Sequence, residues 1–156
     1  MKRALMGFCG ALSLLGAGCF SSQTPVVLDP CARLPAEQVA RVTGVGVTLT
    51  EPETLGSGLM RCQYFTGERE TLLQVTDDSA SVSAFVAQLR NAFPTNNQPS
   101  IEEGVISGSS SALVTLQSGG MMLFVASGTG GYLLSNVANP VMTREMLIQL
   151  GTVLAQ

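Results

Sequence analysis

Residues 111–137 read SALVTLQSGGMMLFVASGTGGYLLSNV, and this stretch decides the fold. Apolar and polar residues alternate from Ala112 to Leu116, and two further apolar runs follow, at 121–126 and 132–137. Glycines lie in the gaps between these runs, at 118–120 and 127–131. Alternation with a period of two indicates strands, and short Gly-rich gaps indicate hairpin turns. The stretch therefore predicts a three-stranded antiparallel meander and disfavours a helical bundle.

A helix is predicted before the meander and another after it, and the other predicted elements lie toward the N-terminus. Residues 82–93 carry apolar side chains at helical spacing, after a polar start at Asp77, Asp78 and Ser79 that suits an N-cap. A last helix follows the capping residue Thr143.

Toward the N-terminus, residues 34–43 predict a helix that ends at Gly44, and residues 45–50, 60–65 and 71–76 predict strands. Residues 51–58 and 95–100 predict loops, and 104–108 a short edge segment.

The elements follow one another in the order α-β-β-β-α-β-β-β-α. This order predicts a single α+β domain over residues 29–156, with an antiparallel sheet and its helices packed on one face.

One strand of the meander is apolar on both faces. Met121, Met122 and Phe124 lie in a run that would place apolar side chains on each side of the sheet. One interpretation is a central strand that is covered on both sides. The other is an exposed apolar patch or pocket that binds a partner or a lipid. The sequence leaves both open.

The first 18 residues are typical of a secretory signal. Lys2 and Arg3 give a positive start, an apolar stretch follows to Leu15, and small residues precede Cys19. The segment 15–19 resembles the bacterial lipobox, and that resemblance implies cleavage before Cys19 and attachment of a diacylglycerol to its thiol. Ordinary secretion with an incidental Cys19 is the alternative. Residues 19–28 are then a lipid-anchored tether that holds the protein at a membrane.

Phe20 follows the lipid cysteine where an Asp would signal retention at the inner membrane. In a bacterium with two membranes, this pattern resembles that of outer-membrane lipoproteins facing the periplasm. The expected location is therefore the cell envelope, with the outer membrane favoured where there is one.

Two cysteines remain after Cys9 and Cys19 are accounted for. Cys31 and Cys62 form an even pair in a chain predicted to be exported, so a structural disulfide is expected. A redox pair or a metal site is the alternative. The spacing is far from C-x-x-C, and no His is present to complete a zinc site.

Composition excludes several classes of function. The formal net charge is −3, so no basic field attracts nucleic acid. The chain has no His, and its one Lys lies in the predicted signal, which removes His-based triads and Lys nucleophiles. The acidic pair Asp77-Asp78 fits the capping of a helix, and the acidic pair Glu102-Glu103 fits a solvated loop. The serines at 109–111 have no base to activate them and fit a loop. We expect no catalytic residue, no cofactor and no metal.

Three short motifs resemble a group of exported proteins. Asp29-Pro30-Cys31, a helix that ends at Gly44, and the strand Cys62-Gln63-Tyr64 are similar to those of small actinobacterial lipoproteins of unknown function. The resemblance covers residues 29–64. It implies an α+β lipoprotein domain with one disulfide and no catalytic residue.

The expected function follows from the anchor and the missing chemistry. The sequence favours a non-catalytic, membrane-anchored envelope lipoprotein that acts as a protein-interaction module, with another envelope protein as its partner. The alternative is a small-molecule or lipid-binding lipoprotein with an apolar pocket near Met121, Met122 and Phe124.

Overall fold

The computed structural model describes residues 29–49, 52–56, 58–67, 70–78, 80–128, 130–136 and 139–156. The predicted signal, Cys19 and the tether lie outside this part of the chain. The described elements, in chain order, are α1 (Pro30–Arg33), α2 (Ala36–Thr43), β1 (Val47–Leu49), β2 (Glu53–Thr54), β3 (Met60–Thr66), β4 (Glu70–Asp78), α3 (Val82–Ala92), the 3-10 turn η1 (Thr95–Asn97), β5 (Ser100–Glu103), β6 (Ser111–Thr115), β7 (Met121–Ser127), β8 (Gly130–Asn136) and α4 (Arg144–Leu154).

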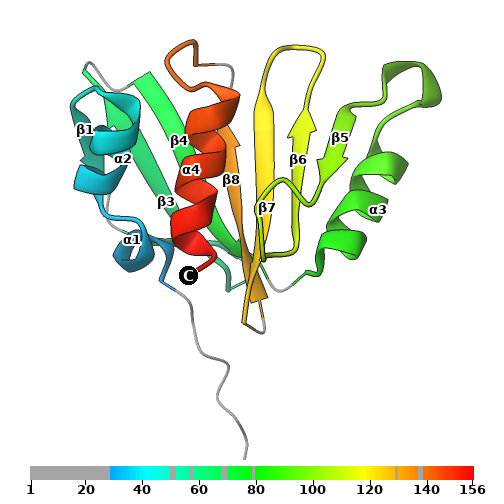
Figure 1. Ribbon diagram of the computed structural model, residues 1–156, viewed down its shortest axis with the longest axis horizontal. Coiled ribbons are helices and arrows are strands. Elements are labelled where there is room, and N and C mark those ends of the chain that lie inside the picture. Colours follow the sequence, from blue (N-terminus) through cyan, green and yellow to red (C-terminus); the bar gives the residue numbers. More distant parts are fainter. Residues whose placement is uncertain are drawn as a thin grey trace, which may run out of the picture.

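The strands form one antiparallel sheet in the order β1-β3-β4-β8-β7-β6-β5, with β2 also paired to β3 (Figure 1). The meander predicted from residues 111–137 is confirmed as β6, β7 and β8. The pair β4–β8 joins it to the N-terminal strands, with Val75 opposite Leu134. An α+β fold built on an antiparallel sheet is therefore correct.

A β-bulge adjusts the register between β3 and β4. Tyr64 lies opposite Leu73 while Phe65 lies opposite Thr71, so Leu72 is the extra residue on β4. A bulge of this kind directs two neighbouring side chains toward one face and increases the local twist. Leu72 and Leu73 are both fully buried in the same core as a result.

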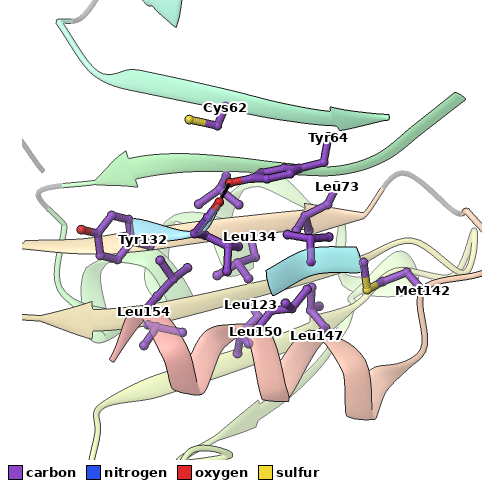
Figure 2. Close-up of a cluster of buried hydrophobic side chains, with 14 of the residues drawn as sticks. Cys62, Tyr64, Leu73, Leu123, Tyr132, Leu134, Met142, Leu147, Leu150 and Leu154 are labelled. Carbon is purple, nitrogen blue, oxygen red and sulfur yellow. Dashed lines mark hydrogen bonds between the residues drawn. The ribbon is translucent and has the colours of Figure 1, made fainter. Parts of the chain in front are cut away.

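The larger core lies between one face of the sheet and the helices α1, α2 and α4. Figure 1 shows α2 in front of β1 and β3, and α4 in front of β8. The helix α4 also contacts β7. Inward residues of four strands meet three leucines spaced along α4, as Figure 2 shows: Cys62, Tyr64, Leu73, Leu123, Tyr132, Leu134, Leu147, Leu150 and Leu154.

The helices do not all share one face, so that part of the prediction is wrong. Phe85 and Val86 of α3 pack on Ala112, Val114 and Phe124, whose side chains leave the sheet on the side opposite α4. The physical reason lies in β7, which is apolar on both faces and needs cover on both.

The predicted order α-β-β-β-α-β-β-β-α is also wrong, because the described residues form one more helix and two more strands. A short helix, α1, precedes the predicted one, because Asp29 caps it through the amides of Cys31 and Ala32. The edge strand is β5, at 100–103, and residues 104–108 form a loop instead. β2 lies within the predicted loop 51–58.

The helix α3 begins later than the acidic residues suggested. Asp77 and Asp78 extend β4, and the cap is Ser81, whose Oγ accepts from the amide of Ala84 at 3.2 Å. Ser79 lies outside the described residues.

Candidate functional site

A cleft of about 870 Å³ is lined by the start of α3, the loop between β5 and β6, and the β7–β8 hairpin. The start of α3 and the turn of this hairpin lie at the lower end of the sheet in Figure 1. We call this cleft the serine cleft, and its lining comprises residues 80–83, 103–104, 106–111, 126, 128 and 130. Its volume is in the range typical of ligand sites, about 300–1,000 Å³. A second hollow, of about 140 Å³, lies beside Phe93 and is too small to compete with it.

The first wall of the serine cleft is the start of α3. Ser81 and Ser83 have hydroxyls that are hydrogen-bonded to each other at 3.0 Å. The carboxylate of Asp78 accepts from the amide of Ala80 at 2.8 Å and fixes the turn that leads into the helix. These contacts hold the two serines at the rim.

The second wall is the loop between β5 and β6, and it is closely held. Ser111 Oγ accepts from the amide of Ile106 at 3.0 Å. The hydroxyl of Ser109 donates to the carbonyl of Ala126 at 3.1 Å, and the amide of Ala126 donates to the carbonyl of Ser110 at 2.9 Å. Gly104 takes a φ of 71°, a left-handed conformation that other residues rarely adopt.

Ile106 ties this loop to the main core. It is only 4% exposed and belongs to the cluster beneath α4. A Cβ at Gly151 of α4 would lie 2.9 Å from Ile106 Cδ1 and 2.5 Å from Leu123 Cδ2, so the glycine allows this close approach.

The electrostatic character of the serine cleft is neutral to acidic. Within the described ranges its lining includes one carboxylate, that of Glu103, and no Arg. Hydroxyls and main-chain groups both donate and accept hydrogen bonds. Among the described residues the lining has no His or Lys, and no hydrogen bond joins its one carboxylate, that of Glu103, to a serine. The arrangement therefore suits non-covalent binding of an uncharged or cationic group.

The sequence predicted the disulfide and did not predict the serine cleft. Cys31 of α1 and Cys62 of β3 are joined, with their Cα atoms 5.6 Å apart. The carboxylate of Asp29 lies within 4.8 Å of both sulfurs. Because the sulfurs are bonded to each other, they offer no thiolate to a metal ion.

The proposed apolar patch divides between two cores. Phe124 is fully buried and its ring stacks on Phe85, with ring centroids 5.2 Å apart. Met121 is half-buried against the larger core and Met122 against the smaller one. An exposed patch that includes Phe124 is therefore wrong, and the run 121–125 is a central strand covered on both sides.

The remaining motifs take structural roles. The amide of Met60 donates to Asp77, and the guanidinium of Arg144 donates to Glu102 at 2.7 Å. Ser109 and Ser110 lie in the predicted loop, whereas Ser111 is the first residue of β6, and all three line the serine cleft. Gly128 and Gly130 belong to the β7–β8 hairpin, as predicted, and also line the cleft.

Both tyrosines of the chain are buried in the larger core. Tyr64 donates to the carbonyl of Leu34 at 2.5 Å, and burial, together with the negative charge of Asp29, raises its pKa. Burial also raises the pKa of Tyr132, an effect that the nearby Arg33 guanidinium partly offsets. Within the described residues the Tyr132 hydroxyl makes no hydrogen bond, and in Figure 2 it points away from the other labelled side chains.

Alkaline pH is expected to destabilise the protein through these two phenols. Each has a folded pKa above the ordinary value of about 10, so the unfolded chain loses its phenolic protons first as the pH rises. The free energy of unfolding should therefore be unaffected by them below about pH 9. Above pH 10 it should fall by up to about 1.4 kcal/mol per pH unit for each phenol.

Urea denaturation at pH 8 and pH 11 measures this effect. Tyr64→Phe is the control, because it removes one phenol and should make the fall with pH shallower. An unchanged free energy of unfolding between the two pH values would contradict the burial of the phenols.

None of the helices in the described part of the chain is both long and apolar enough to cross a membrane. Comparisons with protein-family models, with curated proteins and with solved structures found no match.

Proposed function

We propose that this protein is an exported lipoprotein, attached to the membrane through Cys19, whose domain binds another envelope protein and catalyses no reaction. Where the cell has two membranes, the anchor lies in the outer one and the domain faces the periplasm. The serine cleft is the binding site in this proposal.

Export is supported by two independent features. The disulfide between Cys31 and Cys62 is the kind of bond that persists in oxidising compartments. The first 18 residues have the charge, apolar stretch and small residues of a secretory signal. The lipid anchor rests on the segment 15–19 and on its resemblance to the lipobox.

The serine cleft is the observation that supports a binding role. Three separate segments of the chain build it, and hydrogen bonds hold its loop wall in one conformation. Its side chains can donate and accept hydrogen bonds, and among the described residues its one carboxylate, that of Glu103, is not hydrogen-bonded to any of its serines. Such a site favours recognition over chemistry.

A small polar molecule is the second candidate, since the volume of about 870 Å³ suits one. The form of this alternative that required an apolar pocket at Met121, Met122 and Phe124 has lost its basis, because β7 is covered on both faces. What remains of it is a polar ligand in the serine cleft.

Native mass spectrometry of the full chain, extracted gently from its own membrane, tests the proposal. We expect a diacylated Cys19 and a protein companion at a fixed ratio. Ser83→Trp should abolish the companion, because Ser83 is exposed at the rim and an indole there would fill the serine cleft. Gln149→Trp is the matched control, on the exposed face of α4, and should leave the companion bound.

Other outcomes would separate the alternatives. A lipidated chain that carries a small extra mass, lost in Ser83→Trp, would replace the protein partner with a small ligand. A companion that survives Ser83→Trp would overturn the role of the serine cleft. A mature chain without lipid would overturn the anchor.

A further inference from the structure

We infer that the occupant of the serine cleft is an extended peptide segment with a positive charge, which Glu103 recognises. This inference rests on the proposed function and gives the bound segment its chemistry.

The hydrogen-bonding groups of the serine cleft match a peptide main chain. Ser107 and Ser110 are exposed on the loop wall, and Ser83 is exposed on the α3 wall opposite. An extended peptide presents an N–H and a C=O from every residue, and hydroxyls can meet either. In the part of the chain that the structure describes, the lining contains no aromatic ring on which a nucleobase could stack.

The charge of the serine cleft selects against anions. Among the described residues Glu103 is the one charged residue of the lining, and Asp78 adjoins the serine cleft through the amide of Ala80. The protein as a whole adds to this field, because loss of Lys2 and Arg3 with the signal takes its net charge from −3 to −5. A cationic segment is therefore attracted both from a distance and at contact.

Glu103 is available for this contact, whereas its neighbour is not. The two residues are adjacent on β5, so their side chains leave the strand on opposite faces. Glu102 pairs with Arg144 at 2.7 Å on the α4 side. Glu103 lines the serine cleft and has no ion-pair partner among the described residues. Substitution of Glu103 therefore tests the contact, and the same substitution of Glu102 is its matched control.

Panning of a random octapeptide display library on the full lipidated chain in detergent tests the inference. The enriched peptides should carry Lys or Arg, and Ser83→Trp should prevent their enrichment. Glu103→Gln should lower the affinity of the enriched peptides by about three- to fivefold, the effect of one partly solvated ion pair. Glu102→Gln should leave the affinity unchanged.

Three results would overturn the inference. They are enrichment of neutral or acidic peptides, equal effects of Glu102→Gln and Glu103→Gln, and failure to enrich any peptide that Ser83→Trp blocks. If the protein companion is still lost in Ser83→Trp, such a result removes the cationic peptide but leaves the proposed function standing. If the companion is retained, the proposed function itself fails.

Discussion

Phe124→Ala is expected to lower the free energy of unfolding by about 3–5 kcal/mol, the usual cost of removing a fully buried aromatic ring. The ring of Phe124 is inaccessible to solvent and stacks on Phe85 between β7 and α3. Its loss would leave a cavity that the sheet on one side and α3 on the other cannot fill. Equilibrium denaturation in urea measures the change.

Met122→Ala is the control for this substitution. Met122 lies two residues away on the same face of β7 and is only half-buried, so its truncation should cost clearly less. If Phe124→Ala stayed within about 1 kcal/mol of the unsubstituted protein, the ring would have to be exposed. The exposed apolar patch would then return as a candidate binding surface.

Removal of the disulfide is the second large effect. The bond closes a loop between residues 31 positions apart, and the chain-entropy model assigns about 3.7 kcal/mol to a loop of that length. The double variant Cys31→Ala, Cys62→Ala should lose about this amount of stability. A double variant avoids the unpaired thiol that either single substitution would leave.

Chemical reduction provides the check on this prediction. Urea denaturation of the unsubstituted protein with and without a thiol reductant should show the same loss as the double variant. The double variant should not respond to the reductant. Equal stability of the reduced and oxidised protein would mean that the bond does not constrain the unfolded chain.

Local sequence patterns predicted the elements whose signal is contained within them. The meander from Ser111 to Asn136 and the apolar stripe of α3 are read directly from spacing. β5 was missed because a four-residue edge strand with one apolar residue, Ile101, has no alternation to detect. The spacing of apolar residues does not encode which face of the sheet α3 covers, because that depends on the path of the chain across the sheet.

The same distinction between local sequence patterns and packing in space applies to the candidate site. The pairing of Cys31 with Cys62 needed only a count of cysteines and an expected compartment. The serine cleft needed three segments, each of which is correctly interpreted by itself as a cap, a loop or a hairpin turn. The packing of Ile106 beneath α4, the contact of Asp78 with the amide of Ala80, and the hydrogen bonds of Ser109 and Ser110 to Ala126 bring them together. A concentration of serine and glycine between Gly104 and Ser111 was the one visible signal.

The burial of Ile106 has a consequence for the kinetics of recognition. A loop that shares the main core cannot open without exposing Ile106 and disturbing α4. Under the proposed function, the serine cleft is therefore preorganised before its ligand arrives. The protein then loses little conformational entropy on binding, and the entropy cost of ordering comes from the ligand alone. Ligands that differ at one or two uncharged positions should therefore associate at similar rates and be distinguished by their residence times.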